Sequence, residues 1–292
     1  MTSDPRAGGA QVVAARAGGA QVVAARAGGA QAGGARAGGA ARAGDLVDRL
    51  RDGRTLLVSP HPDDIAYSVG GLLALAGPLP RATLLTVFTR SAWALPRRLR
   101  KAGPQVVGAR RRTEELRYCR LRGLADYRPL GLDDASLRGY DDVGELTADP
   151  AADPVGPALT AALVPALRDT AADTVLAPAA VGGHVDHLLV HRAVRAAGLP
   201  SATVLWYEDL PYAGQHPAPQ VRRTLAEERG LTLRHTVEIS GVLAHKVRGM
   251  YVYGSQTDDE CVRQALGHAR RCAADGRGAV ERLWALPEEA DR

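Results

Sequence analysis

Residues 54–64, RTLLVSPHPDD, join a short apolar run to a loop of polar side chains. The run RTLLVS is typical of a strand that is buried on both faces of a sheet. Pro60 and Pro62 bracket the residues that follow, and they prevent regular helix or strand pairing there. The stretch therefore predicts a buried strand and a shaped loop that carries one imidazole and two adjacent carboxylates.

Further apolar runs along the chain alternate with helical patterns. The strand candidates are residues 83–88, 174–178 and 203–208, and the helix candidates are residues 65–76, 105–123 and 185–197. Strands that alternate with helices indicate βαβ units, in which helices cover both faces of a mostly parallel sheet. The sequence therefore predicts an α/β fold.

The N-terminal segment has a different composition. The decapeptide RAGGAQVVAA stands at residues 6–15, is repeated at 16–25 and then decays. Chains rich in paired glycine and alanine cannot offset the entropy of ordering. We predict a disordered low-complexity tail over residues 1–45 and a single domain over residues 46–292. Weak binding of the spaced arginines to an anionic surface is the alternative for the tail.

Composition limits the classes of function. The chain has 292 residues and a formal net charge of +5, of which the first 45 residues carry +3. The remainder lacks a dense basic stripe, which argues against a nucleic-acid partner. No apolar run approaches the roughly 18 residues of a membrane helix, and the three cysteines lack CxxC spacing. We expect a cytoplasmic protein without a membrane or nucleic-acid partner, and we leave a homo-oligomer open.

A second polar cluster follows another strand candidate. The stretch GGHVDH, residues 182–187, comes shortly after the run TVLAP. Because ligands of open α/β sheets bind at the carboxyl ends of the strands, we expect both clusters to lie at one edge. Two histidines and one carboxylate suit Zn²⁺ with a fourth position for water, whose pKa zinc lowers to about 7. Taken separately, the first cluster could be a turn and Asp186 could cap a helix.

The two clusters together resemble the PIG-L/LmbE-like zinc deacetylases. The resemblance rests on Pro60-His61-Pro62-Asp63-Asp64, the following Gly70-Gly71, and Gly183-His184-Val185-Asp186-His187, and it covers about residues 54–260. It implies a Rossmann-like, mostly parallel sheet with helices on both faces. It also implies hydrolysis of an N-acetyl group, commonly on a glucosamine-type sugar.

The resemblance assigns roles to particular residues. It makes three residues the zinc ligands, namely His61, Asp64 and His187. Asp63 would be the general base, and His184 would stabilise the oxyanion or protonate the departing amine. Asp186 would orient one of the histidines.

Three further residues are candidates for substrate binding. The resemblance implies that Arg111 reaches substrate hydroxyls or phosphate, although an i,i+3 ion pair with Glu114 explains it equally well. Asp134 resembles an aspartate that binds a sugar hydroxyl. Glu208 follows a strand and could line the pocket, or it could be a solvated loop acid. Gly182 stands where some mycothiol-pathway relatives carry a tyrosine, which makes a mycothiol-type substrate less favoured.

The leading hypothesis is a Zn²⁺-dependent hydrolase of linear amides. Its substrate would be a small N-acylated amino sugar or glycoside, from which it removes an acetyl or acyl group. One alternative keeps the metal and cleaves the amide of a thiol conjugate. The other is a non-catalytic Rossmann-like module that binds a sugar or nucleotide, although no GxGxxG follows the first strand.

Overall fold

A computed structural model of the protein describes residues 37–140, 147, 149–274 and 276–287, with side chains from residue 44 onward. Its helices are α1 (Ala37–Asp52), α2 (Asp64–Ser68), α3 (Gly70–Ala76), α4 (Arg97–Lys101), α5 (Pro104–Arg122), α6 (Gly156–Asp169), α7 (Val185–Ala197), α8 (Ala218–Arg223), α9 (Leu243–Met250) and α10 (Asp259–Arg271). Its strands are β1 (Thr55–Ser59), β2 (Ala82–Arg90), β3 (Asp126–Asp133), β4 (Thr174–Pro178), β5 (Thr203–Tyr207), β6 (Thr232–Glu238) and β7 (Val280–Ala285).

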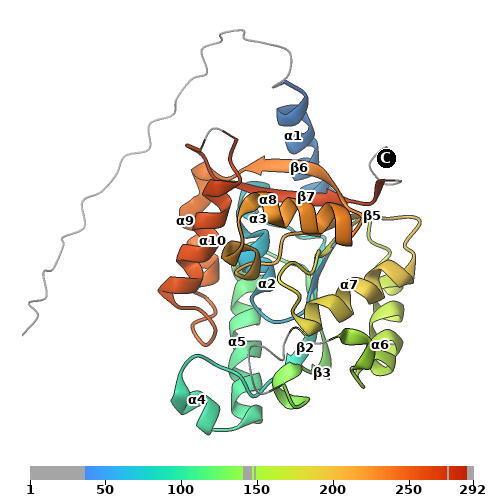
Figure 1. Ribbon diagram of the computed structural model, residues 1–292, viewed down its shortest axis with the longest axis vertical. Helices are drawn as coiled ribbons and strands as arrows, with labels where there is room; N and C mark the ends of the chain where they lie inside the picture. Colours follow the sequence, from blue (N-terminus) through green and yellow to red (C-terminus); the bar gives the residue numbers. More distant parts are fainter. Residues whose placement is uncertain (1–36, 141–146, 148, 275, 288–292) are drawn as a thin grey trace, which may run out of the picture. The chain divides into compact units, whose positions relative to one another are not determined.

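The strands form one sheet in the order β3-β2-β1-β4-β5-β7-β6 (Figure 1). All pairs from β3 to β5 are parallel, and only β7 runs antiparallel to its two neighbours. The chain moves outward from β1 through β2 to β3, and then returns to place β4 on the other side of β1. This reversal creates a switch point between β1 and β4, which is where open α/β sheets bind their ligands.

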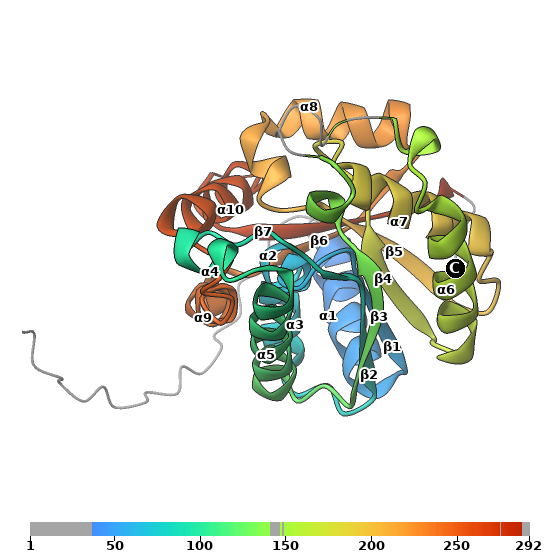
Figure 2. The ribbon, with the colours of Figure 1, turned by 90° about the horizontal axis from the view of Figure 1, so that it is seen from below.

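Helices cover both faces of the sheet, as Figure 2 shows for α1, α3 and α5 on one side and α6 and α7 on the other. Two hydrophobic clusters fill the spaces between the sheet and these helices. Successive residues of β1 contribute to opposite clusters, since Leu56 and Val58 belong to one and Leu57 to the other. This alternation explains why an unbroken apolar run is stable as a central strand.

The predicted α/β class is confirmed, and most predicted elements lie within a residue or two of their expected bounds. The helix expected at residues 65–76 differs, because it divides into α2 and α3 at Val69 (φ −127°, ψ 16°). Helix α5 ends as predicted at Gly123, whose φ of 61° is in the left-handed region that glycine adopts readily.

The predicted boundary at residue 45 lies inside a helix, because α1 begins at Ala37. The prediction of a disordered tail otherwise falls on residues 1–36, outside the described residues. A single domain over residues 46–292 stays a prediction.

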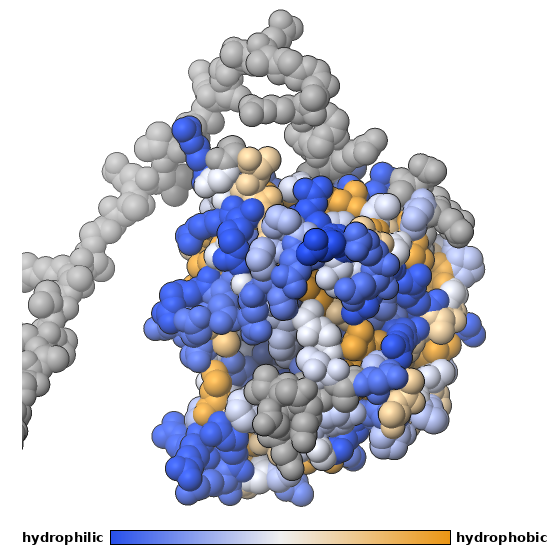
Figure 3. All heavy atoms as spheres, in the orientation of Figure 1, coloured by the Kyte–Doolittle hydropathy of each residue, from blue (hydrophilic) through white to orange (hydrophobic). Residues whose placement is uncertain are grey.

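Hydrophilic residues dominate the described surface on the face shown in Figure 3, and apolar residues lie scattered among them. The large hydrophobic side chains exposed on the described residues are Trp93, Val106, Leu233 and Tyr251. No helix in the described ranges has the length and apolar character needed to span a bilayer. A homo-oligomer stays a prediction.

Candidate active site

The two polar loops predicted from the sequence meet at the switch point of the sheet. Strands β1 and β4 pair in parallel from Thr55↔Thr174 to Leu57↔Leu176, so their carboxyl ends lie side by side. The loop after β1 carries His61, and the segment after β4 carries His187. The centroids of these two imidazole rings are 5.2 Å apart.

Three of the gathered side chains form a group with the spacing of metal ligands. One ligand atom each from His61, Asp64 and His187 lies within 4.8 Å of the others. His61 Nδ1 is 3.6 Å from one oxygen of Asp64, and His187 Nε2 is 3.5 Å from the other. His187 Nε2 is buried and has no hydrogen-bond partner among the described residues. A buried, unpaired ring nitrogen that faces a carboxylate fits a cation bound between them.

A buried carboxylate holds the outer nitrogen of each of these two histidines. Asp186 Oδ2 lies 2.8 Å from His61 Nε2, and Asp209 Oδ1 lies 2.6 Å from His187 Nδ1. Both aspartates are fully buried. Such carboxylate–histidine pairs fix the tautomer and the ring orientation of metal-binding imidazoles. The free nitrogens therefore point towards Asp64.

The carboxylates also make the site electronegative. Burial disfavours the charged imidazole of His61, but hydrogen bonds with Asp186 and Asp64 outweigh this effect and raise its pKa to about 10. The cluster thus stabilises positive charge at the place where the three candidate ligands meet. This is the electrostatic environment that a bound cation requires.

His184 lies beside this group without belonging to the same three residues. It is the N-cap of α7, where its Nδ1 accepts a hydrogen bond from the backbone N–H of Asp186 at 3.2 Å. Burial, together with electrostatic repulsion by the neighbouring His61 and His187, lowers its pKa to about 3. The imidazole is therefore neutral, with its ring centroid 5.2 Å from those of both neighbouring histidines.

Asp63 occupies an unusual backbone conformation at the start of α2. Its φ of 109° is rare for a residue with a Cβ, and such strain is concentrated at functional sites. Burial and the neighbouring charge of Asp64 raise the pKa of its carboxyl well above the usual range. Its Oδ1 lies 3.9 Å from Arg111 Nη2.

Two of the three predicted substrate-binding residues lie together next to Asp63. Arg111 Nη1 is 3.4 Å from Asp134 Oδ2, and Arg111 Nη2 donates to the carbonyl of Pro62 at 3.3 Å. Both side chains are buried. Glu114 does not form the ion pair with Arg111 that the alternative requires, because it accepts hydrogen bonds from Arg110 and Ser255.

The third predicted residue, Glu208, does not join the histidine cluster. Its two carboxylate oxygens lie 2.6 Å from His268 Nε2 and 2.8 Å from Trp284 Nε1. The next residue, Asp209, reaches His187 instead. Neighbouring residues of an extended chain point to opposite sides, so one of these two acids had to face away.

Three further residues at the site were not predicted from the sequence, namely Arg138, Asp209 and Tyr212. Arg138 Nη2 forms ion pairs with Asp186 at 2.6 Å and with Asp153 at 2.8 Å. The ring of Tyr212 packs against His184 and His187, with centroid distances of 5.5 and 5.2 Å. A Cβ added at Gly182 would lie 2.6 Å from Tyr212 Cβ, so Tyr212 fills the space beside that glycine. No local sequence pattern marks these contacts, which the tertiary fold creates.

The switch point of this parallel sheet holds two carboxylate-supported imidazoles and an aspartate, an arrangement that suits a metal-dependent enzyme. The family model that describes GlcNAc-PI de-N-acetylase (PIG-L) matches residues 56–198. The chain is also 69% identical over 256 residues to the 2′-N-acetylparomamine deacetylase of Streptomyces fradiae, covering 82% of this chain and 92% of that protein. The chain therefore belongs to the PIG-L/LmbE-like family of N-deacetylases.

Solved structures share the fold. A deacetylase of the teicoplanin biosynthesis pathway has a TM-score of 0.62 and 23% identity, covering 79% of this chain and 96% of that one. The zinc-inhibited form of teicoplanin deacetylase Orf2 has a TM-score of 0.59 and 25% identity, covering 79% of this chain and 97% of that one. Membership of this enzyme family sets aside the non-catalytic alternative.

Proposed function

We propose that this chain removes the acetyl group from an amino sugar of an N-acetylated aminoglycoside, such as 2′-N-acetylparomamine, with Zn²⁺ as its metal. The observation that carries the proposal is the 69% identity to a 2′-N-acetylparomamine deacetylase over 92% of that protein. The predicted site residues that gather at the switch point support it independently.

The residues present fit a zinc ion. His61, Asp64 and His187 would hold it, since their ligand atoms converge and the buried Nε2 of His187 lacks any other partner among the described residues. When bound, the ion supplies a Lewis acid that activates water and polarises the amide carbonyl. Asp186 and Asp209 keep the two imidazoles oriented towards Asp64.

Proton transfer is the proposed task of Asp63. Its carboxylate accepts a proton from the attacking water and then delivers it to the nitrogen of the departing amine, so that acetate and a free amino sugar are released. The carboxylate makes only the 3.9 Å contact with Arg111 among its described ion pairs, which leaves its oxygens accessible to water.

His184 is proposed to stabilise the oxygen of the acetyl carbonyl as negative charge develops on it. Its backbone position at the start of α7 and its hydrogen bond from Asp186 hold the ring in place. Because Nδ1 accepts this hydrogen bond, the proton of the neutral ring is on Nε2, which can donate to the oxygen.

Substrate hydroxyls are the proposed ligands of Arg111 and Asp134. The guanidinium bridges Asp134 and the carbonyl of Pro62, so it stands beside the loop that carries Asp63. Its buried Nε has no hydrogen-bond partner among the described residues. This arrangement provides a donor and an acceptor next to the reacting group. Glu208 has no part in the proposal.

The test is a measurement of acetate release by the purified full-length chain. We expect release from 2′-N-acetylparomamine, its loss after dialysis against a chelator, and its return on addition of Zn²⁺. An N-acylated thiol conjugate assayed in parallel tests the alternative substrate class. Preferential cleavage of that conjugate, or undiminished activity in the metal-free protein, would overturn the proposal.

A further inference from the structure

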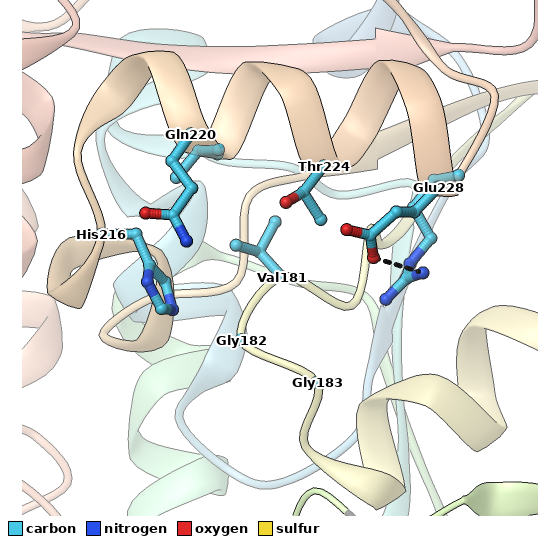
Figure 4. Close-up of a pocket in the computed structure, with 9 residues that line it drawn as sticks. Val181, Gly182, Gly183, His216, Gln220, Thr224 and Glu228 are labelled. Carbon is cyan, nitrogen blue, oxygen red and sulfur yellow. Dashed lines mark ion pairs between the residues drawn. The ribbon is translucent and has the colours of Figure 1, made fainter.

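A cavity of about 240 Å³ borders the segment that leads into His184. Figure 4 shows it between Val181-Gly182-Gly183 and the helical segment formed by α8 and the π-helix η5 (Thr224–Glu228). The mechanism proposed above uses none of the side chains that line it. π-Helical segments often occur at functional sites.

The floor of the cavity includes two glycines, and Tyr212 fills the side of Gly182 where a side chain would stand. Gly182 and Gly183 have φ values of +86° and +74°, a conformation that favours glycine. A Cβ added at Gly183 would meet only Thr147 Cγ2, at 4.0 Å, so the space beside this residue is open. A ligand can therefore approach the main chain directly before His184.

The opposite wall is a stripe of polar side chains. His216, Gln220, Thr224 and Glu228 recur at four-residue intervals, and Figure 4 shows them facing the glycine segment. No hydrogen bond within the described part of the chain occupies the side chains of Gln220 or Thr224. Glu228 lies 3.6 Å from Arg229, which is longer than a hydrogen bond and leaves its oxygens able to accept one.

We propose that this cavity binds the second ring of the substrate, the ring next to the one that carries the acetamido group. This inference rests on the proposed function, because it concerns a glycoside of at least two rings. Hydroxyl groups of that ring would bond to Gln220 and Thr224, and an ammonium group would pair with Glu228.

The position of the cavity supports the placement of the second ring there, with the acetylated ring at the metal-binding group. Gly183 forms part of its floor, and the adjacent residue, His184, belongs to the proposed reaction centre. The cavity therefore borders the segment that carries His184 into the reaction centre. In the proposed arrangement, the acetylated ring lies at the metal-binding group and the neighbouring ring lies in the cavity.

The experiment compares the double variant Gln220→Ala/Thr224→Val with the wild-type chain on two substrates, 2′-N-acetylparomamine and the single-ring N-acetylglucosamine. We expect kcat/KM for the aminoglycoside to fall about tenfold, as the loss of one or two hydrogen bonds implies. Activity on the single ring should stay unchanged, which also shows that the variant is folded. Glu228→Gln should give the same selective loss.

Thr160→Val, which removes an exposed hydroxyl on α6, is the matched control and should leave both activities unchanged. A double variant that loses both activities equally, or neither, would overturn the subsite. If the wild-type chain accepts only the aminoglycoside, an unchanged KM in the double variant would overturn it. By contrast, a wild-type chain that releases acetate from neither substrate would contradict the proposed function itself.

Discussion

Asp209→Asn is expected to weaken Zn²⁺ binding, because it removes the charge that supports His187. Asp209 is fully buried, and its Oδ1 lies 2.6 Å from His187 Nδ1 while its Oδ2 accepts from the backbone N–H of Val181 at 3.0 Å. Asparagine preserves the volume but removes the negative charge that makes the imidazole a stronger ligand, and its single carbonyl oxygen can accept from only one of these two N–H groups. Loss of such a supporting carboxylate typically costs about 10–100-fold in metal affinity, or about 1.4–2.7 kcal/mol.

The assay is a competition titration of the metal-free protein with Zn²⁺ against a chelator of known affinity. Glu208→Gln is the control, because Glu208 is the adjacent buried acid, yet it pairs with His268 and Trp284. We expect the control to keep the wild-type zinc affinity. Wild-type affinity in Asp209→Asn, or an equal loss in Glu208→Gln, would show that the support of His187 by Asp209 has been misread.

Three further predictions follow from other parts of the molecule. Asp63→Ala should lower kcat by about 10²–10⁴-fold, because Asp63 is the proposed base. Metal analysis should find the zinc content unchanged, since Asp63 is not one of the three proposed ligands. Loss of the metal in this variant would contradict the separation of base and ligands. Burial raises the pKa of Glu115 from its usual 4.5 to about 7, although hydrogen bonds from Tyr253 and Thr86 oppose the shift. Folding therefore favours the protonated form of Glu115. This form contributes about 3 kcal/mol to the free energy of unfolding below pH 4.5, and the contribution is lost as the pH rises to 7. In urea unfolding at several pH values, the free energy of unfolding should decline less over that pH range in Glu115→Gln than in the wild-type chain. Identical pH profiles in the two proteins would refute the raised pKa of Glu115. Lys246→Met should lower the free energy of unfolding by about 3–5 kcal/mol, because it leaves Glu281 buried without its cation partner at 2.6 Å; a loss below about 1 kcal/mol in urea unfolding would contradict this estimate.

The central strands could be predicted because burial on both faces of the sheet requires a short run of consecutive apolar residues. Strands β1, β4 and β5 lie inside the sheet, so each is an unbroken apolar run that the sequence shows directly. The edge strand β3 was missed, since its sequence DYRPLGLD contains Pro129 and Gly131, which weaken the strand pattern. A proline is tolerated there because an edge strand has fewer ladder hydrogen bonds to lose.

The candidate site was predictable where its residues immediately follow strands. The loop with His61 and the segment with His187 are short extensions of β1 and β4, so strand order alone brings them together. Arg138 and Tyr212 lie in longer connections, whose paths depend on packing. The path of the chain after β5 decides which of Glu208 and Asp209 contacts His187. The sequence around these two acids does not indicate that path.

The pairing of β1 with β4 also links metal binding to the assembly of the whole chain. His61 and Asp186 are 125 positions apart in sequence, yet they form one hydrogen bond beside the proposed zinc site. An unassembled chain cannot present these side chains together, so the three proposed ligands would hold an ion only in the native state. A free zinc concentration of 100 times Kd would then raise the free energy of unfolding by about 2.7 kcal/mol. Metal supply would thus govern the lifetime of the enzyme against heat and proteolysis as well as its turnover.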